Sequence, residues 1–220
     1  MLLYYITDRH HFPGAPADQR RLLLKKIEEA AAASLDYIQL REKDLSSRDL
    51  ESLAHEARAI IGGHSRLLIN SRSDIALAAN ADGVHLTSTD ISAAEARALW
   101  SKSNPQLSPI FAVSCHDANE VRMAHAQGAN FAVLAPIYGK LDAPPLGLHE
   151  LAKACGRLPT PEHTEAAPNP PAFPVLALGG ISIENAHACL AAGAAGVAGI
   201  RIFQENSVAE VVNQLRALSS

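Results

Sequence analysis

The stretch Tyr37-Ile-Gln-Leu-Arg-Glu-Lys43 changes from apolar to charged within a few residues. Its first half has the composition of a strand buried in a sheet. Arg41, Glu42 and Lys43 then follow together at the C-terminal end of that strand. In a fold built from strand–helix units, this end of each strand faces the ligand crevice. The two cations therefore indicate a clamp for phosphate groups.

The same alternation of a short apolar run and a helical pattern continues along the chain. The predicted strands are Leu2–Ile6, Tyr37–Leu40, Leu67–Ile69, Gly83–Leu86, Ile110–Val113, Phe131–Leu134, Val175–Leu178 and Gly196–Ile200. The predicted helices are Ala17–Ala33, Ser47–Ile61, Ser73–Ala79, Ser92–Ser101, Ala118–Gln127, Leu148–Cys155, Ile183–Ala192 and Val208–Ala217. Eight such units predict an α/β fold, a single (β/α)8 TIM barrel over residues 1–220. An open doubly wound sheet is the structural alternative.

One segment interrupts this pattern. Residues 158–174 are rich in proline and polar residues, which predicts an irregular surface loop. The segment lies between the sixth predicted helix and the seventh predicted strand, on the face opposite the expected site. We therefore expect it to carry no chemistry.

Composition limits the class of protein. The formal net charge is −4 and no basic run is present, so nothing indicates a nucleic-acid partner. No apolar stretch is long enough to cross a bilayer, and the N-terminus lacks the basic start and cleavage site of a signal peptide. Cys115, Cys155 and Cys189 lack metal-ligand spacing, which predicts reduced thiols in a cytoplasmic protein without a membrane partner.

Polar residues follow the predicted strands, and a barrel would bring them onto one rim. Four of these residues are the cations Arg41, Lys43, Lys140 and Arg201. Asn70 and Ser114 could add uncharged hydrogen bonds, and Gly179-Gly180 would let main-chain N–H groups approach a phosphate. Asp90 could hold Mg²⁺ together with phosphate oxygens. The rim therefore suits an anionic ligand.

Several of these residues also have a purely structural interpretation. Arg41 and Glu42 could form an ion pair at the strand end, and Asp90 could cap the helix that follows it. Ser114 alone carries little information, and a histidine such as His85 is more often packed than catalytic. The chemical interpretation depends on all of them reaching one rim.

In their order and spacing, several motifs resemble the thiamine-phosphate synthase and thiazole tautomerase family over nearly the whole chain. These motifs are Gln39-Leu-Arg-Glu-Lys43, Leu68-Ile-Asn70, Ala81-Asp-Gly-Val-His-Leu86, Val113-Ser-Cys-His116, Ala143-Pro-Pro-Leu-Gly147 and Leu178-Gly-Gly-Ile181. The resemblance implies a TIM barrel and an Mg²⁺-dependent transferase. The synthases join an aminopyrimidine methyl diphosphate to a thiazole phosphate, through a carbocation formed as diphosphate departs. The implied partners are these two small molecules, and a homo-oligomer stays open.

The resemblance also implies roles for individual residues. The residues implied to contact the pyrimidine diphosphate are Gln39, Leu40, Arg41, Glu42, Lys43, Asn70, Ser114 and Lys140. The residues implied to surround the thiazole phosphate are Gly180, Ile200 and Arg201. Asp90 is the implied Mg²⁺ ligand. The implied catalytic residues are Lys43, Lys140 and Ser114.

The chain departs from the family pattern at four places. Ser71 stands where the synthases usually carry a second metal-binding aspartate, and Thr87-Ser88 stands where a Gly-Gln pair is usual. The loop Pro136-Ile-Tyr-Gly-Lys140 is shorter than usual and lacks two threonines. Arg201 replaces a small serine. These departures affect the metal site and the phosphate contacts.

Two other functions stay open. A thiazole tautomerase isomerises a thiazole carboxylate phosphate with a general base, but Pro136 occupies the position of the tautomerase histidine. A non-catalytic protein that binds thiazole or thiamine phosphates would account for the missing acid at Ser71. The joint presence of Lys43, Asp90 and Lys140 favours catalysis instead.

Overall fold

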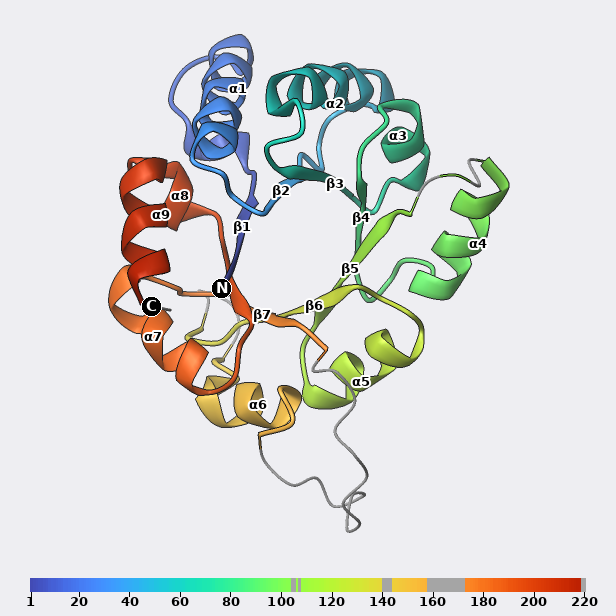
Figure 1. The fold of residues 1–220 in the computed structure, drawn as a ribbon. Helices are drawn as coiled ribbons and strands as arrows, with labels where there is room; N and C mark the ends of the chain where they lie inside the picture. The colour runs from blue at the N-terminus through green and yellow to red at the C-terminus, as the bar shows by residue number, and fades with distance from the viewer. Residues whose placement is uncertain (104–105, 107, 140–143, 158–172, 219–220) are drawn as a thin grey trace.

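A computed structural model describes residues 1–103, 106, 108–139, 144–157 and 173–218. Within them, parallel strands pair in sequence order, and β8 (Gly196–Gly199) pairs with β1 (Leu2–Ile6) to close a barrel. Figure 1 looks along this barrel, with the helices arranged around its outside. The predicted TIM barrel is confirmed, and the pairing of β1 with β8 excludes the open sheet.

All predicted strands and helices are present, and their ends lie within two residues of the predicted ones. The other strands are β2 (Tyr37–Leu40), β3 (Arg66–Asn70), β4 (Gly83–Leu86), β5 (Ile110–Cys115), β6 (Phe131–Leu134) and β7 (Val175–Ala177). The longer helices are α1 (Pro16–Ala32), α2 (Ser47–Ile61), α3 (Ser73–Ala78), α4 (Ala93–Ser103), α5 (Ala118–Ala126), α6 (Gly147–Ala154), α7 (Ile183–Ala191) and α9 (Val208–Ala217). Two short helices, η1 (Arg9–His11) and α8 (Arg201–Gln204), are too short to show a helical period in the sequence.

Helix ends follow from local chemistry, as α2 shows. The side chain of Ser46 accepts a hydrogen bond from the main-chain N–H of Asp49 over 3.2 Å, which caps the start of the helix. Gly62 ends the helix with a φ of +63°, a left-handed conformation that glycine adopts without steric cost.

Side chains along each strand alternate between two cores. Those that fill the barrel interior are Tyr4, Ile6, Leu68, Ala112, Phe131, Val133, Leu176 and Ala198. The residues between them, such as Leu3 and Tyr5, pack between the barrel and the helices. The strand register then assigns the polar residues: Gln39 pairs with Ile6 and Leu68, which places it in the inward row.

The remaining polar strand residues follow the same register. His85 pairs with Asn70 and with Ala112, and Ser114 pairs with Val133. Since Ala112 and Val133 face the interior, Asn70, His85 and Ser114 also belong to the inward row. The C-terminal end of the barrel interior therefore presents amides, a hydroxyl and an imidazole.

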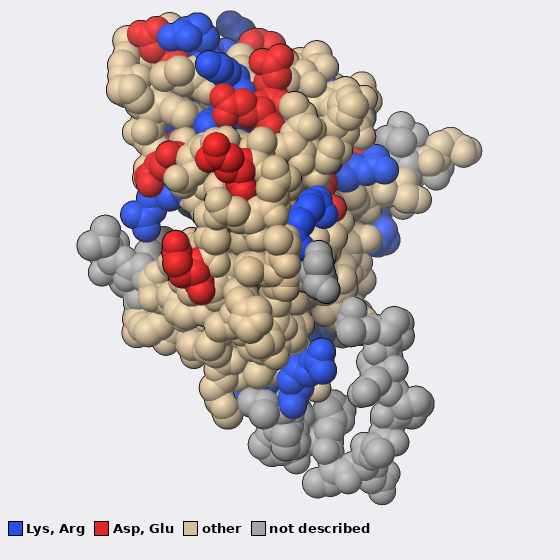
Figure 2. All heavy atoms as spheres, turned by 60° about the vertical axis from the view of Figure 1, so that its left-hand side comes forward, with Lys and Arg blue, Asp and Glu red and all other residues tan. Residues whose placement is uncertain are grey.

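Other features of the described residues agree with the sequence. Cys115, Cys155 and Cys189 are free thiols, and burial raises the pKa of Cys115 to about 12. None of the described helices has the length and apolar character needed to cross a membrane. On the face drawn in Figure 2, acidic and basic side chains are interspersed. Lys140 and residues 158–172 lie outside the described residues, so the predictions for them stay predictions.

Candidate active site

A continuous chain of hydrogen-bonded side chains crosses the C-terminal ends of β2, β3 and β4. Gln39 Nε2 donates to Asn70 Oδ1 over 3.0 Å, and Asn70 Nδ2 donates to Ser71 Oγ over 3.0 Å. Ser71 Oγ donates in turn to Asp90 Oδ2 over 2.7 Å. The predicted residues Gln39, Asn70 and Asp90 therefore meet, because neighbouring parallel strands end at one rim.

Asp90 holds the turn that follows β4. Its Oδ2 atom accepts hydrogen bonds from the main-chain N–H of Thr87 over 2.7 Å and from Thr87 Oγ1 over 2.9 Å. The first turn of α4 is capped by other residues: Glu95 Oε2 accepts from Ser92 N, and Ser92 Oγ accepts from Glu95 N. The interpretation that Asp90 caps this helix is therefore wrong.

The Asp90 carboxylate has one oxygen left for a metal ion. Its hydrogen bonds with described residues all end on Oδ2. No group of three or more His, Cys, Asp or Glu side chains converges within the described part of the chain. Mg²⁺ commonly binds through one or two carboxylates, with phosphate oxygens and water as its remaining ligands. Asp90 therefore fits Mg²⁺ as a single protein carboxylate, provided that a phosphorylated ligand supplies other oxygens.

Glu42 is committed to an internal network. It is 4% exposed, and its Oε1 accepts from Thr7 Oγ1 over 2.6 Å. Its Oε2 pairs with the Arg9 guanidinium over 3.0 Å and accepts from the Arg9 main-chain N–H over 3.1 Å. The structural alternative of an ion pair between Arg41 and Glu42 is thus wrong, because Glu42 pairs with Arg9 instead. A direct contact between the Glu42 side chain and a ligand would have to displace these bonds.

Arg9 is the residue that sequence reasoning missed. Its guanidinium also pairs with Asp44, and this cation lowers the pKa of the Asp44 carboxyl. The only sequence signal was its place two residues after Thr7, just beyond the end of the first strand. Arg9 is only 7% exposed, so its guanidinium is available to hold the buried carboxylate of Glu42. Local sequence does not reveal this burial. Through its ion pairs with Glu42 and Asp44, Arg9 holds the loop that follows β2.

The other residues of this loop have different environments. Arg41 is half-buried, and its main-chain N–H donates to Thr7 Oγ1 over 3.0 Å. Lys43 is exposed. Leu40 is 1% exposed and packs in the core outside the barrel, so only its main chain could face a ligand. Arg41 and Lys43 are therefore the cations that β2 offers to an anion.

A second polar group lies deeper in the barrel. His85 Nδ1 lies 2.9 Å from the Tyr4 hydroxyl, and His85 Nε2 lies 2.7 Å from Ser114 Oγ. Burial, together with the positive charge of Arg41, lowers the pKa of His85 to about 3. His85 is therefore a packed, neutral histidine, as expected, and it connects the barrel interior to the half-buried Ser114 at the rim.

The ends of β7 and β8 form the other side of the rim. Gly179 and Gly180 have φ values of +96° and +69°. Asn185 ties their turn, since its Oδ1 accepts from Ser182 N over 2.8 Å and its Nδ2 donates to Gly180 O over 2.8 Å. Ile200 precedes α8, and the exposed Arg201 begins it. Phosphate sites in this fold often combine these loops with a short extra helix.

Gly179 is required by close packing, which gives a stability prediction. A Cβ added there would lie 2.7 Å from Pro136 Cα. We expect Gly179→Ala to lower the free energy of unfolding by about 2–4 kcal/mol, from clash and backbone strain together. Urea denaturation measures this loss. Gly156→Ala is the control, because Gly156 has a φ of +68° but open space around its Cβ position; it should lose only about 1 kcal/mol. Equal losses in both variants would contradict the packing argument.

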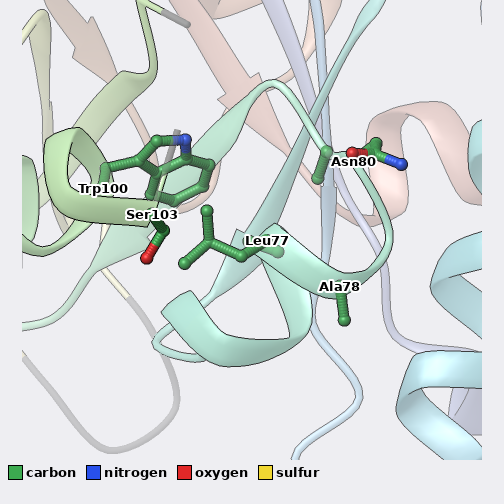
Figure 3. A pocket seen from close by; sticks show the side chains of 7 residues that line it. Leu77, Ala78, Asn80, Trp100 and Ser103 are labelled. Carbon is green, nitrogen blue, oxygen red and sulfur yellow. The ribbon is translucent and has the colours of Figure 1, made fainter. Parts of the chain in front are cut away.

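The pocket of about 330 Å³ between α3 and α4 is not part of this rim. Figure 3 shows the side chain of Leu77 pointing toward Trp100 and Ser103. Ala78 and Asn80 also line the pocket. These residues belong to the C-terminal parts of α3 and α4 and to the turn before β4, which lie at the opposite end of the barrel. None of the predicted site residues lines it.

Comparison with known proteins identifies the family. A family model described as thiamine monophosphate synthase matches residues 3–203. A Geobacter sulfurreducens protein with a provisional thiamine-phosphate synthase name is 41% identical over 201 residues, 89% of this chain and 83% of the relative. The thiamine-phosphate synthase of Clostridium acetobutylicum is 34% identical over 199 residues, with the same shares covered.

A solved structure agrees with these sequence comparisons. The thiamine phosphate pyrophosphorylase of Pyrococcus furiosus superposes with a TM-score of 0.76 at 26% identity, over 99% of this chain and 94% of that one. The match of family, relatives and fold covers the strands and loops that build the rim. The chain therefore belongs to the thiamine monophosphate synthase family and is a transferase of the thiamine-phosphate synthase type.

Proposed function

We propose that the protein joins an aminopyrimidine methyl diphosphate to a thiazole phosphate and releases diphosphate. The observation that carries this proposal is the hydrogen-bonded chain from Gln39 through Asn70 and Ser71 to Asp90, beside the cations Arg41 and Lys43. Amides that can bind a heterocycle therefore lie next to charges that can bind a diphosphate.

The proposed reaction replaces a C–O bond with a C–N bond. The bond between the pyrimidine methylene carbon and the diphosphate oxygen breaks, and both electrons leave with the oxygen. The thiazole nitrogen then gives its lone pair to the methylene carbocation. Such a reaction needs stabilisation of the departing anion and alignment of the nucleophile, without a side-chain nucleophile.

Individual residues would divide this work. Arg41 and Lys43 would balance the negative charge that grows on the departing diphosphate. Gln39 and Asn70 already orient each other over 3.0 Å, so their remaining donors would hold the pyrimidine in a fixed position. Lys140 is proposed as a further cation on the resemblance alone.

Asp90 would hold Mg²⁺ through its second carboxylate oxygen. When bound, Mg²⁺ would neutralise diphosphate oxygens. Ser71 would support Asp90 through their 2.7 Å hydrogen bond, without itself adding a negative ligand. We therefore expect weaker metal binding than in a site with two carboxylates.

The tautomerase alternative lacks a base at the expected place. Pro136 occupies the position of the tautomerase histidine and packs against Gly179. Among the imidazoles near the rim, His85 is buried and has both ring nitrogens within hydrogen-bond distance of Tyr4 and Ser114. His116, which follows β5, is exposed, and its Nδ1 lies 3.2 Å from Glu120 Oε2. Proton abstraction from a thiazole is therefore the less favoured function.

Incubation of the purified protein with both proposed substrates and Mg²⁺ tests the proposal directly. We expect thiamine phosphate and inorganic diphosphate to form in equal amounts. Isomerisation of a thiazole carboxylate phosphate, with no coupled product, would support the tautomerase instead. Binding of a thiazole phosphate without turnover of either kind would support a binding protein.

Arg201 gives a separate prediction for the thiazole phosphate. Its guanidinium offers a bidentate fork at the start of α8, so Arg201→Ala should weaken binding of a thiazole phosphate by about tenfold. Isothermal titration calorimetry measures this affinity. Arg48→Ala, which removes an exposed arginine from α2, should leave it unchanged. An unaltered affinity in Arg201→Ala would contradict the placement of the phosphate at β8.

A further inference from the structure

The hydrogen bonds of Tyr4 restrict how its proton can be placed. Tyr4 is fully buried, and the rings of Tyr37 and Phe131 pack edge-on against it with centroids 5.8 and 5.6 Å away. Among the described residues, the hydroxyl of Tyr4 has one hydrogen-bond partner, His85 Nδ1 at 2.9 Å. A buried phenol proton without an acceptor would lose its hydration with no compensation. The Tyr4 hydroxyl therefore donates to His85 Nδ1.

This donation decides the state of His85. A neutral imidazole carries one N–H, so an Nδ1 atom that accepts requires the proton on Nε2. Nε2–H then donates to Ser114 Oγ over 2.7 Å. The opposite order would make Ser114 the donor to His85 and would leave the Tyr4 proton facing the apolar barrel interior. Tyr4, His85 and Ser114 all face the barrel interior, as the strand register shows. The two hydrogen bonds from Tyr4 to His85 and from His85 to Ser114 therefore form one chain, called the relay below.

Ser114 is where the relay reaches the rim. Its oxygen accepts from His85, so its own proton must point elsewhere, and no described residue accepts it. The residue is half-buried, beside the open end of the barrel. With one lone pair taken by His85, the hydroxyl has its O–H donor and one remaining lone pair to offer to a ligand.

We propose that Tyr4 and His85 are positioning residues that fix the Ser114 hydroxyl as a hydrogen-bond donor to an acceptor atom of the substrate. The inference rests on the proposed function and adds the direction of one hydrogen bond to it. The acceptor has the chemistry of a phosphate oxygen or of an unprotonated ring nitrogen.

The tautomer of His85 tests the proposal without any substrate. In ¹⁵N-labelled wild-type protein, NMR correlations between ring nitrogens and ring protons distinguish the two neutral tautomers from imidazolium. We expect His85 to carry its proton on Nε2 from about pH 5 to about pH 8, the range in which ordinary histidines titrate. A proton on Nδ1, or an imidazolium in this range, would overturn the relay.

Removing the first donor tests the role of Tyr4. In Tyr4→Phe we expect His85 to populate both tautomers, and kcat/KM to fall about 3- to 10-fold, the equivalent of one hydrogen bond. Tyr37→Phe removes a hydroxyl from a ring that touches Tyr4, and it should change neither quantity. A Tyr4→Phe variant with an unchanged tautomer and unchanged kcat/KM would refute the proposal.

Ligand binding separates the two acceptors and separates this inference from the proposed function. Ser114→Ala should weaken binding of Mg²⁺–pyrophosphate if the acceptor is a phosphate oxygen, and of the aminopyrimidine alcohol if it is a ring nitrogen. Unchanged affinity for both would refute donation by Ser114. If the wild type forms no thiamine phosphate, the proposed function fails, whereas the tautomer of His85 still decides the relay.

Discussion

Replacement of Lys43 with alanine is expected to lower turnover by about 10²–10³, the loss found when one electrostatic donor to a transition state is removed. Lys43 follows β2 beside Arg41 and is exposed, so its ammonium can approach a departing diphosphate. The charge on the leaving oxygen grows as the C–O bond breaks, and the effect should therefore appear in kcat more than in KM. Steady-state kinetics with both substrates measures it.

Folding and control variants make this prediction specific. Lys43→Ala should keep the thermal midpoint of the wild type, because an exposed lysine at the rim contributes little to the core. Lys102→Ala removes an exposed lysine from the last turn of α4, far from the rim, and should keep full activity. Wild-type turnover in a well-folded Lys43→Ala protein would show that this residue does not act on the diphosphate.

Loss of the charge on Asp90 should be equally severe. We expect Asp90→Asn to abolish Mg²⁺-dependent turnover, a fall of at least about 10²-fold, because Asp90 is the one carboxylate that the described residues contribute to the proposed metal site. The amide oxygen of asparagine can still accept the hydrogen bonds that Ser71 and Thr87 give to Asp90 Oδ2. The fold should therefore survive. Activity assays across an Mg²⁺ titration, with circular dichroism as the folding control, measure both effects.

Ser71→Asp tests the same site in the opposite direction. Ser71 has a φ of +60°, a conformation that aspartate tolerates, and its Oγ lies 2.7 Å from Asp90 Oδ2. A second carboxylate here should tighten Mg²⁺ binding by roughly tenfold in the presence of a diphosphate analogue. Without Mg²⁺ the two carboxylates should repel each other and lower the thermal midpoint. If calorimetry detects no Mg²⁺ in either protein, Asp90 is a turn residue and no more.

The fold was largely predictable because its two signals are local. Apolar strands and amphipathic helices alternate regularly, and capping residues such as Ser46 lie at the expected ends. The two helices of three and four residues were not predictable, since η1 and α8 are about as short as the repeat that reveals a helix. The meeting of the strand ends on one rim was also predictable, and it brought Gln39 and Asn70 within hydrogen-bond distance.

The partners within the site were less predictable, because burial and pairing depend on the whole barrel. Sequence proximity made an ion pair between Glu42 and Arg41 one interpretation, whereas the parallel pairing of β1 with β2 brings the end of β1 beside β2 and pairs Glu42 with Arg9. Asp90 likewise looked like a helix cap, but Ser92 and Glu95 already cap α4. In both cases, local sequence identified a charged residue and tertiary contacts decided its partner.

The strict alternation of inward and outward side chains has a consequence for how this barrel can diversify. Gln39 faces the interior and Leu40 faces the helices, although they are neighbours in β2. A library confined to inward positions such as Gln39, Asn70 and Ser114 would thus alter ligand preference and spare the apolar shell around the barrel. Natural mutations could act in the same way. Changes at the inward strand residues would alter the substrate, while the outward residues between them would keep the fold stable.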